Sequence, residues 1–268
     1  MLRTNCHTHT TYCDGTATPA ELVQEAMQKG FSCLGFSGHS FLSNGEDWYM
    51  SPSGTESYKK EIRALAEKCK GSMDVLCGVE QDFLSPASTE GYDFVIGSVH
   101  FVEKDGVLLT VDRSTEDTVM AINEHYSGSF DAFAEDYYAL VSRVHAVTGC
   151  DIIGHFDLIS KFNEILELQE SPRYLRAAFE ALEALVGCGC PFEINTGAMS
   201  RGYRTSPYPS IPILKRLREL GGSVIITSDC HSAGNLDYAF DRALAHAREA
   251  GFTEIKHLTS AGFIEEKI

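Results

Sequence analysis

The chain has 268 residues, of which 43% are hydrophobic and 22% are charged, as is typical of one α/β barrel with a large core. No apolar run is long enough to span a membrane, and the polar N-terminal residues predict no signal peptide, so we expect a cytoplasmic protein. The formal net charge of −16 argues against nucleic-acid binding, because an acidic surface repels phosphates.

In chain order, short apolar runs alternate with helical patterns. The first helix follows a capping signal, with Thr18 as N-cap, Pro19 at the first position and Glu21 at the third, and it stops at Gly30. Nearly continuous apolar runs such as 224–227 are typical of parallel strands covered on both faces. Strands are predicted at residues 3–9, 32–39, 74–81, 93–100, 150–156, 190–195 and 222–229. Further helices are predicted at residues 55–70, 131–148, 172–187, 209–220 and 236–250.

This alternation predicts one α/β domain over residues 1–268. Repeated strand–helix units form parallel sheets, and no linker, low-complexity tract or internal repeat divides the chain. We expect a single closed or nearly closed barrel, in which the reactive groups lie at the carboxyl ends of the strands.

Histidines and carboxylates follow nearly every predicted strand. Two i, i+2 pairs project to one side of an extended strand: His7 with His9 after the first strand, and Asp229 with His231 after the seventh. The other candidates are Asp14, His39, Glu80, His100 and His155. Imidazole and carboxylate are ligands of zinc, iron and manganese. Nine such groups exceed the needs of one ion, so we predict a cluster of two or three ions with a bridging carboxylate such as Glu80.

Such a cluster is suited to phosphoryl transfer. Several ions generate hydroxide at neutral pH and clamp phosphoryl oxygens in an in-line displacement, and their charge attracts a phosphate ester to an acidic protein. No G-x-S-x-G signature of an activated nucleophile occurs. We therefore expect direct attack by a metal-bridging hydroxide, with inversion at phosphorus. Asp229, His231 or a metal-bound water would protonate the leaving alkoxide.

Polar side chains in the loops after later strands are candidates for substrate binding. Arg201 and Arg204 follow the sixth strand and suit bidentate phosphate contacts, and Lys161 follows the fifth. Glu193 at the end of the sixth strand either orders the metal ligands from behind or meets a cationic group of the substrate.

Six segments, in this order, resemble the PHP (polymerase and histidinol phosphatase) family, and within it the monofunctional histidinol-phosphate phosphatases. The segments are 7–15 (HTHTTYCDG), 35–40 (GFSGHS), 78–82 (GVEQD), 97–100 (GSVH), 154–157 (GHFD) and 228–231 (SDCH). The resemblance covers nearly the whole chain. It implies a distorted seven-stranded, TIM-like (β/α)7 barrel that holds three divalent transition-metal ions, either zinc, iron or manganese.

The resemblance also implies which residues share each ion and which reaction they serve. The first ion would take His7, His9, Glu80 and Asp229, the second Glu80, His100 and His155, and the third Asp14, His39 and His231. The implied reaction is hydrolysis of L-histidinol phosphate to L-histidinol and phosphate, in histidine biosynthesis. Three alternatives stay open: a phosphoesterase for another small ester such as a nucleotide or sugar phosphate, a metal-dependent amidohydrolase, and an inactive metal-binding interaction module.

The remaining histidines and the cysteines are expected to be structural. Four histidines lie in or beside predicted helices and should be surface or packing residues: His125, His145, His246 and His257. The nine cysteines include no C-x-x-C motif and are predicted to be reduced thiols. Those beside apolar runs should pack in the core: Cys33, Cys77 and Cys150. Cys188 and Cys190 are the closest pair in sequence.

Overall fold

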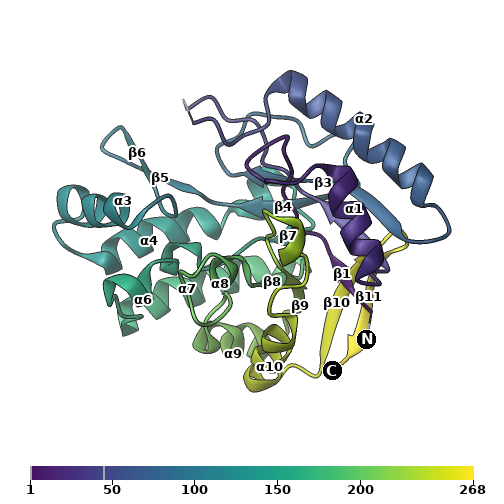
Figure 1. The fold of residues 1–268 in the computed structure, drawn as a ribbon. Helices are drawn as coiled ribbons and strands as arrows, with labels where there is room; N and C mark the ends of the chain where they lie inside the picture. Colours follow the sequence, from purple (N-terminus) through teal and green to yellow (C-terminus); the bar gives the residue numbers. More distant parts are fainter. Residues whose placement is uncertain (1, 45) are drawn as a thin grey trace.

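The computed structural model describes residues 2–44 and 46–268. Its main sheet has nine strands in the order β1-β2-β3-β4-β7-β8-β9-β10-β11. Neighbouring strands from β1 to β10 run parallel, and β11 pairs with β10 antiparallel. Figure 1 shows helices packed around this sheet, so the predicted α/β class with a mostly parallel sheet is confirmed.

All seven strands predicted from apolar runs are present, most of them shorter than expected. They are β1 (Thr4–Asn5), β2 (Cys33–Phe36), β3 (Asp74–Asp82), β4 (Phe94–Ser98), β7 (Ile152–Ile153), β8 (Phe192–Asn195) and β9 (Val224–Thr227). These are consecutive neighbours in the sheet. Their carboxyl ends therefore lie along one end of it.

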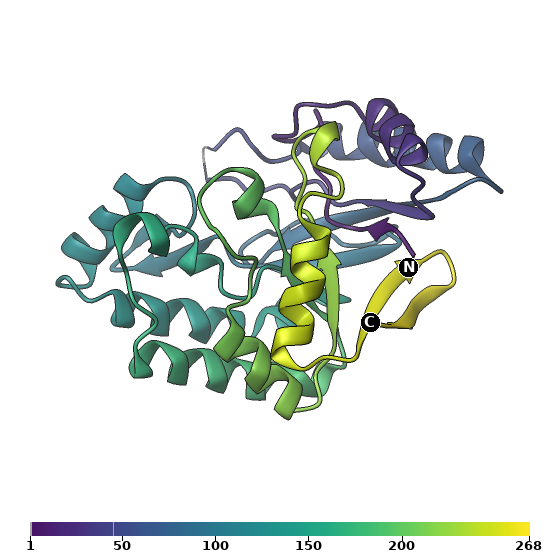
Figure 2. The ribbon, with the colours of Figure 1, turned by 60° about the horizontal axis from the view of Figure 1, so that its bottom comes forward.

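The expected strand count of seven is wrong, because two hairpins escaped prediction. One is the separate pair β5 (Phe101–Lys104) and β6 (Val107–Thr110). The other, β10 (Glu254–Thr259) and β11 (Gly262–Lys267), extends the main sheet beside the N-terminus, as Figure 2 shows. Both are partly exposed and carry charged residues, so no continuous apolar run marks them. His257, expected in or beside a helix, lies in β10.

A closed barrel is not confirmed: in the part of the chain that the structure describes, the strand order is open and no ladder joins its two ends. Two contacts nevertheless bring β1 and the segment after it close to β10 and to the segment after β9. A single parallel bridge joins Thr8 after β1 to Cys230 after β9. In addition, Thr4 Oγ1 lies 2.9 Å from Nδ1 of His257 in β10. The sheet is therefore strongly curved, and residues that follow different strands meet.

The helices cover this curved sheet from outside. Thr18 and Glu21 form the predicted capping box at the start of the first helix, and the predicted helix 131–148 is divided in two. The helices are α1 (Pro19–Gln28), α2 (Pro52–Cys69), α3 (Thr115–Met120), α4 (Phe130–Val141), α5 (Val144–Thr148), α6 (Asn163–Leu166), α7 (Pro172–Leu185), α8 (Gly197–Ser200), α9 (Ile211–Glu219) and α10 (Phe240–Ala250). Short turns of 3-10 or π-helix are η1 (Ala121–His125), η2 (Leu158–Ser160), η3 (Val186–Cys188) and η4 (Ala233–Asn235). None of the described helices is long and apolar enough to cross a membrane.

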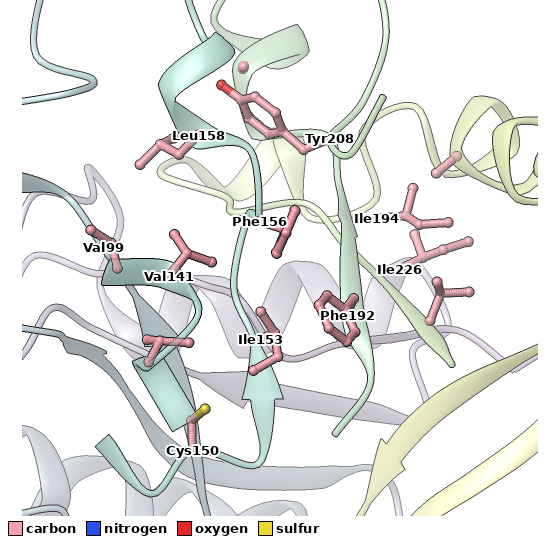
Figure 3. Close-up of a cluster of buried hydrophobic side chains, with 14 of the residues drawn as sticks. Val99, Val141, Cys150, Ile153, Phe156, Leu158, Phe192, Ile194, Tyr208 and Ile226 are labelled. Atoms are coloured by element: carbon pink, nitrogen blue, oxygen red, sulfur yellow. The ribbon is translucent and has the colours of Figure 1, made fainter. Parts of the chain in front are cut away.

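The core lies between the sheet and these helices. Figure 3 shows Ile153, Phe156 and Phe192 from neighbouring strand segments close to Val141 of α4, and all four side chains are buried. Burial of such large apolar side chains is worth roughly 1.5–3 kcal/mol each. This packing makes the strands a firm base for the polar residues at their carboxyl ends.

Candidate active site

All nine predicted metal ligands gather at the carboxyl end of the sheet. The segments that carry them follow β1, β2, β4, β7 and β9, and Glu80 lies within β3. A cavity of about 280 Å³ opens there. Seven of the nine line it, namely Asp14, His39, Glu80, His100, His155, Asp229 and His231. His7 and His9 are fully buried and contact the same carboxylates.

Glu80 is the centre of this arrangement, because its two carboxylate oxygens face different histidines. Oε2 lies 2.9 Å from His39 Nδ1, 3.3 Å from His7 Nε2 and 3.5 Å from His9 Nε2. Oε1 lies 2.8 Å from His155 Nε2 and 3.3 Å from His100 Nε2. A carboxylate placed between two groups of imidazoles can bridge two ions, as predicted for this residue.

Asp14 organises a second group of ligands nearer to solvent. Its Oδ2 lies 3.0 Å from His231 Nε2, and its Oδ1 lies 3.5 Å from His9 Nδ1 and 3.7 Å from His39 Nε2. One potential ligand atom from each of these four residues lies within 4.8 Å of the others. The same holds for three further groups around Glu80 and Asp229. The side chains can thus hold several ions close together.

The fit to metal ions rests on buried atoms that lack hydrogen-bond partners. His7 Nε2, His9 Nε2 and Glu80 Oε2 are inaccessible and form no hydrogen bond in this structure, although buried polar atoms are usually paired. His9 Nε2 and His7 Nε2 both point at Glu80 and at Asp229 Oδ1. Coordination of divalent ions would satisfy these atoms, and imidazole and carboxylate are the appropriate donors.

Two further carboxylates hold the imidazoles in place. Glu193 Oε1 lies 2.7 Å from His7 Nδ1, and its Oε2 accepts the backbone N–H of His155 at 2.9 Å. Asp82 Oδ2 lies 2.9 Å from His100 Nδ1. Each therefore turns an Nε2 atom toward Glu80, as partners of metal-bound histidines do. Asp82 was missed, although it stands two residues after Glu80 on β3 and so shares its face.

The charges in the site favour ionised carboxylates. Burial opposes ionisation of Glu80, but nearby histidines, chiefly His7 and His39, hold the pKa of its carboxyl well below the usual range. Burial also opposes the charge of His39, but Glu80 and Asp14 raise the pKa of His39 to about 10. Burial lowers the pKa of His9 to about 3, which keeps this imidazole neutral and ready to act as a ligand. The carboxylates require positive charge here, which imidazolium groups or metal ions can supply.

Of the four predicted substrate-binding residues, two line the cavity. Arg201 Nη2 donates to Asp229 Oδ2 at 3.1 Å, its Nη1 lies 2.9 Å from His231 Nδ1, and its Nε is buried without a partner. Lys161 Nζ donates to the backbone and side-chain oxygens of Asp112 at 2.7 and 3.1 Å. Both cations thus line the same cavity as the predicted metal ligands.

Arg204 and Glu193 do not line this cavity. Arg204 Nη1 donates to the backbone oxygen of Ser160 at 3.0 Å and to its hydroxyl, and the guanidinium lies over the ring of Tyr208. Glu193 instead contacts His7 Nδ1 and the backbone N–H of His155. Arg201 and Arg204 lie in one loop, and their spacing in the sequence does not predict which of the two side chains lines the cavity.

Other residues of the cavity were not predicted, since they come from loops rather than from strand ends. They are Trp48, Asp112, Arg113, Leu158 and Tyr203. Trp48 stands edge-on to His39 and His100, with ring centroids 4.8 and 5.6 Å away. Nothing in the local pattern around Trp48 indicates that it reaches the site.

Comparison with known proteins gives a consistent picture. The PHP domain family model matches residues 5–197. A Deinococcus radiodurans protein named "Probable histidinol-phosphatase" is 30% identical over 257 residues, which cover 91% of this chain and 92% of that protein. The Bacillus subtilis histidinol-phosphatase is 25% identical over 91% of this chain and 99% of its own.

A solved structure shares the fold. It is the histidinol phosphate phosphatase of Lactococcus lactis complexed with zinc, L-histidinol and phosphate, with a TM-score of 0.70, 23% identity and coverage of 98% of both chains. The family model spans most of the present chain, and the Deinococcus relative matches nearly all of it. The chain therefore belongs to the PHP domain family, in its histidinol-phosphatase branch.

Proposed function

We propose that the protein hydrolyses L-histidinol phosphate to L-histidinol and inorganic phosphate at a centre of three divalent transition-metal ions. The observation that carries this proposal is Glu80, whose two oxygens face separate groups of imidazoles within one cavity. The names of the Deinococcus and Bacillus relatives and the ligands of the Lactococcus structure support the choice of substrate.

Nine residues would hold the ions: His7, His9, Asp14, His39, Glu80, His100, His155, Asp229 and His231. Bound there, divalent ions lower the pKa of water toward neutrality and neutralise phosphoryl oxygens. Arg201 and Lys161, which both line the cavity, would bind the phosphate. Asp229 and His231, which line the cavity, would pass a proton to the leaving alkoxide.

The rest of the cavity suits the other end of this substrate. Trp48 and Tyr203 give it aromatic walls, and Asp112 adds a carboxylate. A flat imidazole ring stacks on aromatic side chains, and a carboxylate attracts the amino group of histidinol. Glu193 and Asp82 would keep the ligand imidazoles oriented during the reaction.

We further infer that residues 1–268 form one domain, with its seven first-predicted strands arranged as a distorted barrel. The bridge between Thr8 and Cys230 supports this inference, because it brings the strand-end segments of β1 and β9 together. Truncation of the β10–β11 hairpin should then lower stability and leave the metal ligands in place. Elemental analysis of the truncated chain shows whether the metal ions are still bound.

The experiment that tests the function is phosphate release over a panel of esters. Metal-loaded protein is assayed with histidinol phosphate, a nucleoside monophosphate, a sugar phosphate and an aryl phosphate. We expect the highest kcat/KM for histidinol phosphate. A higher value for another ester would reassign the substrate, and no release from any ester would leave the metal-binding module as the better account.

A further inference from the structure

A second cluster of metal-ligating side chains lies at the amino end of the sheet, away from the active site. His145, Cys188 and Cys190 each offer a ligand atom within 4.8 Å of the others. Cys150 adjoins them, with its Sγ 3.9 Å from His145 Nδ1. Figure 3 shows Cys150 at the amino end of β7, whereas Leu158 and Tyr208 lie toward the opposite end. The mechanism proposed above uses none of these four residues.

The four residues come from the two segments that precede β7 and β8. His145 lies in α5, and Cys150 precedes β7 by two residues. Cys188 ends η3, and Cys190 precedes β8 by two residues. Because β7 and β8 are adjacent parallel strands, the loops that enter them run side by side. The fold therefore brings together two pairs of residues that are about forty positions apart.

The turn between Cys188 and Cys190 allows both thiols to bind one ion. Gly189 has a φ of 78°, in the left-handed region that favours glycine. This turn lets the backbone N–H of Cys190 donate to Cys188 Sγ at 3.3 Å. Both thiols thus face one another across a Cys-Gly-Cys turn. All four side chains are buried or half-buried, and the cysteines are free.

Two separations from His145 are close to those between ligands around a tetrahedral ion. With Zn–S about 2.3 Å and Zn–N about 2.0–2.1 Å, neighbouring ligand atoms lie roughly 3.5–3.8 Å apart. The His145 Nδ1 to Cys190 Sγ distance is 3.6 Å, and that to Cys150 Sγ is 3.9 Å. His145 Nδ1 also lies 2.9 Å from the Cys150 carbonyl oxygen, so binding would exchange that hydrogen bond for a bond to the ion.

The thiols of Cys150 and Cys190 are also adjacent. Cys190 Sγ donates to the backbone oxygen of Cys150 at 3.3 Å, so the two residues are in direct contact. Metal binding requires thiolates and releases their protons.

We propose that Cys150, Cys188, Cys190 and His145 form a structural zinc site of the Cys3His type. Three thiolates select zinc over the harder manganese, and four protein ligands leave no open position for chemistry. The ion would tie together the loops that enter β7 and β8. It would thereby stabilise β7, which His155 follows, and β8, which contains Glu193.

Sulfur coordination separates this site from the active site, whose proposed ligands are nitrogen and oxygen only. Zinc-loaded wild-type protein should show Zn–S scattering at about 2.3 Å by X-ray absorption. Cobalt-substituted protein should show a sulfur-to-cobalt charge-transfer band. The double variant Cys188→Ser/Cys190→Ser should lose both signals and one zinc equivalent, and it should retain phosphatase activity.

The matched control is Cys13→Ser. Cys13 Sγ lies 3.5 Å from His9 Nδ1, so it is a thiol beside the active site that could bind an ion instead. Cys13→Ser should keep the sulfur signals. Their loss in this variant, or their survival in the double variant, would overturn the proposal. So would absence of Zn–S scattering from fully loaded wild-type protein, a measurement that needs no variant to fold.

Discussion

Glu80 is the residue on which the proposed metal centre depends most. Substitution Glu80→Gln keeps its shape but removes the charge and replaces one ligand oxygen with an NH2 group that cannot bind a cation. Mutation of a residue that only hydrogen-bonds to a metal ligand already lowers metal affinity or activity by about 10–100-fold. Because Glu80 is itself a proposed ligand, we expect its substitution to lower kcat by more than about 100-fold. The loss should also exceed that of any single His→Ala change. Elemental analysis should show fewer ions per chain. Near-normal turnover of Glu80→Gln would contradict the bridging role.

Arg201 and Arg204 offer a paired test, because the structure places only Arg201 along the cavity. Hydrogen bonds to charged groups contribute about 1.5–3 kcal/mol, so Arg201→Ala should raise KM for the phosphate ester by about tenfold or more. Arg204→Ala removes contacts with Ser160 and Ser206 and should lower the unfolding temperature with KM unchanged. Steady-state kinetics on both variants decides the matter. A rise in KM for Arg204→Ala alone would reverse the assignment.

His246 makes stability depend on pH at a distance from the active site. Burial lowers its pKa below the ordinary 6.5, and its Nε2 lies 2.8 Å from the backbone oxygen of Pro209. The unfolded chain then binds a proton at higher pH than the folded chain, so this contribution to stability is present above pH 6.5 and is lost as pH falls below it. We expect His246→Gln to show a smaller loss of unfolding free energy between pH 7.5 and 5.5 than wild type. Equal losses in urea titrations would argue against this role.

Among the elements, β3 combines support of the core with support of the site. A Cβ on Gly78 would lie 2.3 Å from the ring of Phe94 in β4, and Glu80 follows two residues later. Gly78→Ala should therefore destabilise the protein by about 1–3 kcal/mol, the usual effect of overpacking, and also reduce metal content. Gly234→Ala is the control, because a Cβ there meets no atom within 4 Å. Thermal unfolding of both variants, with elemental analysis, gives the comparison.

At the scale of the whole molecule, the metal centre should hold the curved sheet together. Its ligands come from segments that follow β1, β2, β4, β7 and β9 and from β3, and without ions several buried polar atoms are unpaired. A ligand at 100 times its Kd stabilises the folded state by about 2.7 kcal/mol. Chelator treatment should therefore abolish activity and lower the unfolding temperature, and added zinc or manganese should restore both. An unchanged unfolding temperature in metal-free protein would show that the ions do not brace the fold.

Much of this arrangement could be predicted from local sequence. Apolar runs located the seven strands, because strands covered on both faces need nearly continuous hydrophobic sequence. His7, Glu80 and Asp229 could be predicted as candidate metal ligands, because the strand ends of a parallel sheet share one edge. The capping signal at Thr18 located the start of α1. Each of these features depends only on the amino acids within a few residues of it in the sequence.

Only the tertiary structure decided the features that depend on distant segments. The β10–β11 hairpin owes its place to pairing with β9 and contact with β1, and its charged, half-exposed residues carry no strand pattern. The path of one loop decides that Arg201 lines the cavity and Arg204 does not. Trp48 reaches the site from the long connection between β2 and α2. His145 and Cys150 meet Cys188 and Cys190 because β7 and β8 are neighbours. Sequence by itself determined the candidate ligands and the strands, since their signals are local and periodic. Which side chains face the cavity, and which thiols meet, follows from packing between segments far apart in the chain.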